Sequence, residues 1–141
     1  MRAPGLDRAR ALRQLRGPRE LVLFACVSAF ACAVPLLMRL PLPRVRALIA
    51  RSPGRRATVA PERLARLVEL APQVSHPLVR TGCLPRGVTL FWFLRRAGFD
   101  VELRFGLDPA GADGHCWLAL DGEPYLERVE VSRFTELYRL P

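Results

Sequence analysis

The chain has 141 residues, half of them apolar, which suffices for one domain with a buried core and excludes intrinsic disorder as its overall state. Its net charge of +9 is uneven, because residues 1–66 carry 14 arginines against three acids and residues 67–141 carry eight against ten. The arginines do not alternate with aromatic residues in any nucleic-acid-binding pattern, so no nucleic-acid partner is expected. The basic front half instead predicts contact with an acidic partner or a membrane surface.

Four cysteines, Cys26, Cys32, Cys83 and Cys116, form no C-x-x-C pair and no regular spacing. This pattern predicts reduced thiols in a cytoplasmic protein. No metal or cofactor is expected, since zinc bound by Cys83, His115 and Cys116 would need a fourth ligand and closer sequence pairing.

Residues 1–19 are polar and arginine-rich, with a composition that is compatible with a helix. The uncharged stretch 21–38 follows, at the lower limit of about 18 residues that a membrane span needs. A buried or partner-covered helix, an interfacial helix and a true span all stay open for it. Pro35 is expected to kink or end this helix, because proline removes a backbone donor and clashes with the preceding turn.

Next, residues 44–51 predict a short basic amphipathic helix and residues 52–56 a turn. A further helix is predicted to begin at Thr58 or Pro61 and to stop at Pro72. Its apolar residues recur at i, i+3, i+4 and i+7, namely Leu64, Leu67, Val68 and Ala71.

A central helix is predicted from Cys83, because Pro85 stands in its first turn and Gly98 follows its end. It is apolar nearly all round, which indicates burial. Cys83 would lie where unpaired amides and the positive end of the helix dipole favour an anion and so a reactive thiolate.

The period then changes from helical to alternating, which predicts strands over residues 101–105 and 115–120. Asp121-Gly122 predicts a turn, residues 125–131 a third strand, and residues 132–140 a short helix. The expected fold class is therefore α+β, with N-terminal helices followed by a small antiparallel sheet that packs on the Cys83 helix.

A histidine at the start of the second strand can pair with a thiolate and carry its proton, which suits His115 to act as base for Cys83. A third group must orient the imidazole. Chain order leaves Asp121 or Glu127 for that role, and the hypothesis is a cysteine hydrolase.

Residues 83–127 resemble the transglutaminase-like cysteine peptidases that remove the leader from lasso-peptide precursors. The resemblance rests on Cys83-Leu84 with Arg86 two residues on, a hydrophobic helix ending in Arg95-Arg96-Ala97-Gly98, a strand ending at Gly106, and His115-x-Trp117 leading to Leu120-Asp121-Gly122. Relatives commonly have alanine or serine where this chain has Cys116. They carry glutamate four residues after the histidine, where this chain has Ala119.

The resemblance implies a papain- or transglutaminase-like core in which Cys83 forms a thioester with the substrate. Counting along the family pattern puts the third catalytic residue at Glu127, with Asp121 as the reserve candidate. Division into a helical segment, residues 1–72, and a peptidase core, residues 73–141, is expected.

The implied partners are a precursor peptide, a recognition-element protein that presents the leader in trans, and an ATP-dependent, asparagine-synthetase-like cyclase. Recognition in trans is expected because the chain is too short for a separate leader-binding domain. Contact with a membrane surface would run through residues 21–51. Two alternatives remain: a transglutaminase-like acyltransferase on another peptide, and a non-catalytic membrane- or partner-binding module of the same fold.

Overall fold

A computed structural model describes the whole chain except residues 1–3, 51–58, 77, 80 and 112, so the predicted turn at 52–56 lies outside the described residues. The described part forms helices α1 (Pro4–Leu12), α2 (Pro18–Leu37), α3 (Leu42–Ala50), α4 (Pro61–Ser75) and α5 (Cys83–Arg96), and strands β1 (Val101–Leu107), β2 (Gly114–Leu120), β3 (Glu123–Tyr125) and β4 (Thr135–Leu140). The α+β prediction is confirmed.

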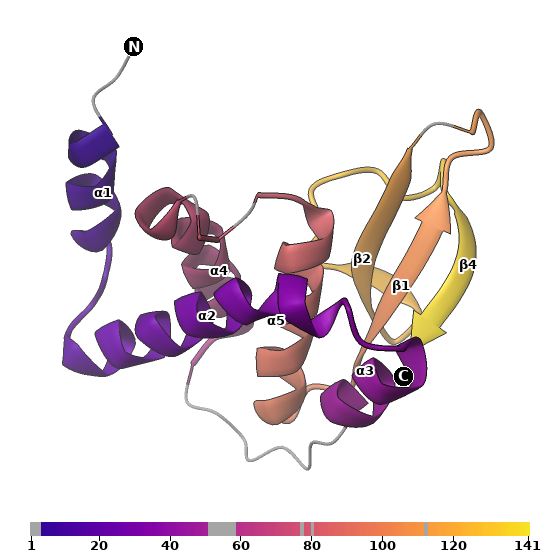
Figure 1. Ribbon diagram of the computed structural model, residues 1–141, viewed down its shortest axis with the longest axis horizontal. Coiled ribbons are helices and arrows are strands. Elements are labelled where there is room, and N and C mark those ends of the chain that lie inside the picture. Colours follow the sequence, from indigo (N-terminus) through magenta and orange to yellow (C-terminus); the bar gives the residue numbers. More distant parts are fainter. Residues whose placement is uncertain (1–3, 51–58, 77, 80, 112) are drawn as a thin grey trace.

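Helix α5 lies in the middle of the molecule, with α2 and α4 on one side and the antiparallel sheet on the other (Figure 1). The strand order is β3-β2-β1-β4. Register pairs Leu103 with Leu118 and Phe105 with Cys116, so these side chains share the face that packs on α5. This confirms the expectation of a buried central helix against a small sheet.

The predicted C-terminal helix over residues 132–140 is wrong, because this segment contains β4, which pairs with β1. Tyr138 lies opposite Phe105, and Leu140 lies opposite Leu103 and is buried. This segment has no strong preference for helix or strand, and pairing with β1 makes it the edge strand of the sheet.

Neither proline ends its helix: the predicted stop at Pro72 is wrong, and of the two outcomes expected at Pro35, an end of the helix is excluded. Helix α4 continues past Pro72 to Ser75, and α2 continues past Pro35 to Leu37. Each proline forfeits one amide hydrogen bond, but only two or three helical residues follow it, so the disturbance is confined to the end of the helix.

The hairpin after β2 is confirmed, but its second strand is short. Asp121 and Gly122 have positive φ, 52° and 85°, as a two-residue hairpin turn requires. The predicted strand over 125–131 is wrong in extent, since β3 ends at Tyr125 and the chain then leaves the sheet.

The N-terminal helices are tied to the rest through Arg63 of α4. Its Nε donates to Glu20 of α2 at 2.5 Å, and its guanidinium also donates to the Gln14 carbonyl. The hydrogen bond from Arg63 lowers the pKa of Glu20 to about 2. The pair therefore stays charged at neutral pH and anchors α2 beside α4.

Gly106 provides a direct test of the packing between β1 and its neighbours. A Cβ at this position would lie 2.8 Å from the Thr135 carbonyl oxygen and 3.0 Å from the Trp117 ring. We expect Gly106→Ala to lower the free energy of unfolding by about 1–3 kcal/mol, measured by urea denaturation. Gly114→Ala is the matched control, because its Cβ would meet nothing closer than 3.5 Å. Equal effects of the two changes would contradict this packing.

Candidate active site

Cys83 is the first residue of α5, and its helix start lacks a side-chain cap. Gly82 is the N-cap residue, with φ +141° and no capping hydrogen bond. Since Pro85 has no amide hydrogen, the amides of Cys83 and Leu84 are the donors of this first turn. The half-buried thiol therefore stands where an anion is favoured.

The nearest sulfur neighbour of Cys83 is Cys116 of β2. Gly87, one helical turn after Cys83, leaves the space that Cys116 fills, since a Cβ there would lie 3.0 Å from the Cys116 Sγ. Burial, and after it the charge of the neighbouring Cys83, raise the pKa of the Cys116 thiol. Cys116 therefore stays protonated at neutral pH, which leaves Cys83 as the candidate nucleophile of this pair.

His115 follows Gly114 at the start of β2 and is largely enclosed by aromatic rings. Its ring stacks on Phe134 at 5.1 Å and on Trp117 at 6.3 Å between centroids. Its Nε2 is buried without a hydrogen-bond partner and lies 3.5 Å from Glu127 Oε2. That separation is within ion-pair range and longer than a hydrogen bond, as is common for catalytic contacts without substrate.

The Glu127 carboxylate is held in a defined orientation. Its Oε1 accepts hydrogen bonds from the amides of Arg128 and Val129, at 2.9 and 3.2 Å. Its Oε2 is the oxygen that faces His115, and the side chain is only 7% exposed. The main chain thus fixes one oxygen, and the other is left to orient the imidazole.

Asp121 lies at the other end of β2. Six residues of extended chain separate it from His115, which corresponds to about 20 Å. It is exposed and occupies the first position of the hairpin turn. The structure thus brings Glu127, and not the reserve candidate Asp121, to His115.

His115 and Cys116 are neighbours on β2, so their side chains point to opposite faces of the sheet. Cys83 lies on the face of Cys116, opposite the face of His115. Cys83 contacts Cys116 on the α5 face, and no hydrogen bond joins its thiol to His115 among the described residues. Glu127 lies beside His115, and its charge contributes to the raised pKa of the Cys116 thiol. Among the described residues, the two candidate groups are thus linked through neighbours, Cys116 for Cys83 and Glu127 for His115, and not by a direct contact.

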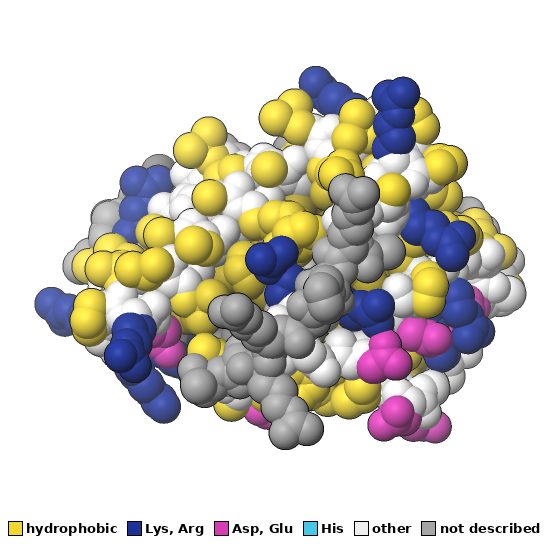
Figure 2. All heavy atoms as spheres, turned by 90° about the horizontal axis from the view of Figure 1, so that it is seen from below, with side chains coloured by type: hydrophobic (Ala, Val, Ile, Leu, Met, Phe, Trp, Pro, Cys, Tyr) yellow, Lys and Arg dark blue, Asp and Glu magenta, His cyan; other side chains and the backbone are white. Residues whose placement is uncertain are grey.

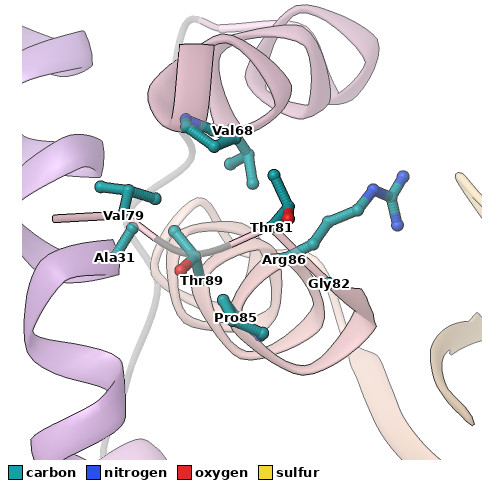
Figure 3. Close-up of a pocket in the computed structure, with 9 residues that line it drawn as sticks. Ala31, Val68, Val79, Thr81, Gly82, Pro85, Arg86 and Thr89 are labelled. Atoms are coloured by element: carbon teal, nitrogen blue, oxygen red, sulfur yellow. The ribbon is translucent and has the colours of Figure 1, made fainter. Parts of the chain in front are cut away.

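Two hollows flank the start of α5, separated by Arg86. One, of about 100 Å³, is apolar and lies between α2, α4 and α5, with the unpartnered hydroxyl of the buried Thr89 at its wall (Figure 3). The other, of about 280 Å³, is lined by charged residues that include Glu69, Glu127 and Arg128. Figure 3 shows the Arg86 side chain extending away from the apolar hollow.

Sequence reasoning missed two contributors, Glu69 and Phe134. Glu69 is 58 positions from Glu127 along the chain and reaches the site only because α4 packs beside α5. Phe134 comes from the segment that was predicted to be helical. Neither carries a local signal that could have revealed it.

The fold is a papain-like α+β fold. Its central helix begins at a cysteine and packs on an antiparallel sheet whose second strand begins near a histidine. The family model described as the transglutaminase-like superfamily matches residues 21–139, and the chain belongs to this superfamily. Its members are typically cysteine peptidases or acyltransferases. Comparison with curated proteins and with solved structures gave no significant match. The family match runs across the division expected at residue 72.

Proposed function

We propose that this chain is a cysteine peptidase that removes the leader from a ribosomally made lasso-peptide precursor. The observation that carries the proposal is the fixed Glu127 carboxylate facing His115 Nε2, next to the helix start that holds Cys83. The choice of a lasso-peptide precursor rests on the resemblance over residues 83–127.

In the proposed reaction the Cys83 thiolate attacks the scissile carbonyl carbon, and the first amides of α5 stabilise the oxyanion. Protonated His115 gives its proton to the leaving amine, which departs as the C–N bond breaks and a thioester remains. A water molecule, deprotonated by His115, then attacks the thioester, and the acid product leaves with the Cys83 thiolate restored.

In the proposed mechanism the two nitrogens of His115 have different tasks. Nε2 faces Glu127, so Nδ1 is the nitrogen left to exchange a proton with Cys83. The proposed reaction requires the Cys83 thiol and His115 to come into contact when the substrate binds, as substrate binding commonly tightens such pairs.

Partners follow from the same proposal. A recognition-element protein would hold the leader while the scissile bond enters the site, and an ATP-dependent cyclase would use the amine that cleavage frees. The charged hollow beside Glu127 supports an extended peptide passing close to the site.

The test is incubation of a precursor peptide with the protein and the recognition element, followed by mass spectrometry. Leader and core peptides whose masses sum to the precursor plus one water are expected. A leader joined to an added amine, without gain of water, would instead indicate the acyltransferase. No turnover under any of these conditions would support the non-catalytic module.

We also propose that the N-terminal half contacts an anionic membrane surface. Helix α2 is long and apolar enough to cross a membrane by length and composition, with 22% of its most apolar window buried. Its outer face includes Leu21, Val22 and Leu36, which are 50–64% exposed. Apolar side chains also cover large areas of the face seen from below, with basic side chains among them (Figure 2).

We expect the protein to sediment with phosphatidylglycerol vesicles and much less with phosphatidylcholine vesicles, because the arginines attract anionic headgroups. The double change Val22→Asp and Leu36→Asp should lower binding at least about tenfold, since both side chains would otherwise enter the interface. Leu137→Asp, at a similarly exposed position on β4, is the control. Equal binding by all three proteins would contradict this contact.

A further inference from the structure

We propose that Arg86 and Glu69 are positioning residues that hold Glu127 against His115. This inference rests on the proposed function and deepens it, because it identifies what places the third member of the site. Neither residue contacts the reacting atoms in the proposed mechanism.

Arg86 lies in α5, three residues after Cys83, and reaches the segment that precedes Glu127. Its Nη2 donates to the Leu126 carbonyl oxygen at 2.6 Å. Leu126 has φ +53°, a left-handed conformation that an L side chain rarely adopts without a constraint. The hydrogen bond from Arg86 supplies that constraint one residue before the carboxylate.

Glu69 of α4 contacts both arginines that flank this segment, Arg86 of α5 and Arg128 of the segment itself. Its Oε1 lies 3.7 Å from Arg86 Nη2, and its Oε2 lies 2.9 Å from Arg128 Nη2. The Arg128 amide is one of the two donors to Glu127 Oε1. Glu69 is 15% exposed and Arg86 25%, whereas the Arg128 side chain is 75% exposed, so solvent screens the contact with Arg128 more than the contact with Arg86.

These contacts replace the sheet as the support of the segment. Strand β3 ends at Tyr125, and residues 126–131 form no further strand pairing. Because Arg86 shares α5 with Cys83, the helix that carries the nucleophile also sets the position of Glu127. Glu69 makes α4 part of this arrangement.

The test compares the rates at which iodoacetamide alkylates Cys83 in the wild type, Arg86→Gln, Glu69→Gln and the control Arg95→Gln. Peptide mapping after trypsin separates Cys83 from the other cysteines, since it is the single cysteine between Arg80 and Arg86 and, in Arg86→Gln, between Arg80 and Arg95. Rates are measured at about pH 6, where the thiolate depends on its partners, and at about pH 9, where it forms without them.

Glu69→Gln separates positioning from direct charge. Removing the negative charge of Glu69 would speed alkylation at the acidic pH if its charge alone acted on the thiolate. Loss of positioning should instead slow it about tenfold, with the rate at alkaline pH unchanged, because a small displacement of the acid weakens the Cys83–His115 pair. Arg86→Gln should slow it similarly, and leader cleavage should fall in parallel in kcat rather than KM.

Arg95→Gln, on the same helix and paired with Asp100, should retain the wild-type rates. If wild-type Cys83 is reactive at acidic pH and Glu69→Gln is equally or more reactive, positioning by Arg86 and Glu69 is wrong. If wild-type Cys83 is unreactive at acidic pH and no cleavage occurs, the proposed function itself fails.

Discussion

Cys83→Ala is expected to abolish leader cleavage with all partners present, a loss of at least about 10³-fold relative to the wild type. Alanine cannot form the thioester on which the proposed two-step reaction depends. The buried Cys116 cannot replace it, because burial raises the pKa of its thiol and keeps it protonated. The measurement is the rate at which the core peptide appears by mass spectrometry.

Two further cysteine variants make this result specific. Cys26→Ala removes an exposed thiol of α2 and should leave the cleavage rate unchanged. Cys116→Ala should retain the bulk of the activity, since Cys116 has no role in the proposed reaction and the peptidases that residues 83–127 resemble commonly have alanine or serine at the matching position. Cleavage that survives Cys83→Ala but is lost in Cys116→Ala would move the nucleophile to β2 and overturn the proposed site.

Much of the core could be predicted because its signals are local. Proline in the first turn and glycine after the last define α5 as a helix from Cys83, and the structure ends it at Arg96, two residues before Gly98. Alternation predicts β1 and β2, and Asp121-Gly122 predicts the turn between β2 and β3. Each of these features is decided within a few neighbouring residues.

The remaining features depend on contacts between distant parts of the chain. Residues 135–140 become a strand because β1 offers a free edge about 30 positions earlier. The orientation of Glu127 depends on Leu126 at positive φ, on Arg86 and on Glu69, which no local pattern announces. Counting residues along the family pattern predicts Glu127 as the third catalytic residue. The contacts that position it are visible only in the three-dimensional structure.

Glu127→Gln is expected to reduce kcat for leader cleavage by about 10²-fold or more, while Asp121→Asn stays within about twofold of the wild type. Glutamine keeps the shape of the side chain but removes the charge that stabilises the imidazolium of His115. Asp121 lies at the far end of β2, and asparagine tolerates its positive φ as well as aspartate does. Both variants should therefore fold, which a thermal melt checks.

Glu127→Asp distinguishes an orienting carboxylate from a purely structural side chain. Aspartate keeps the charge but withdraws the carboxylate by one methylene, which lengthens a contact that is already 3.5 Å to His115 Nε2. The expected order of activity is therefore wild type, then Glu127→Asp, then Glu127→Gln, because aspartate keeps the charge at a longer distance and glutamine removes it. If Asp121→Asn is the more damaging change, or if Glu127→Gln equals Glu127→Asp in rate, Glu127 does not orient His115.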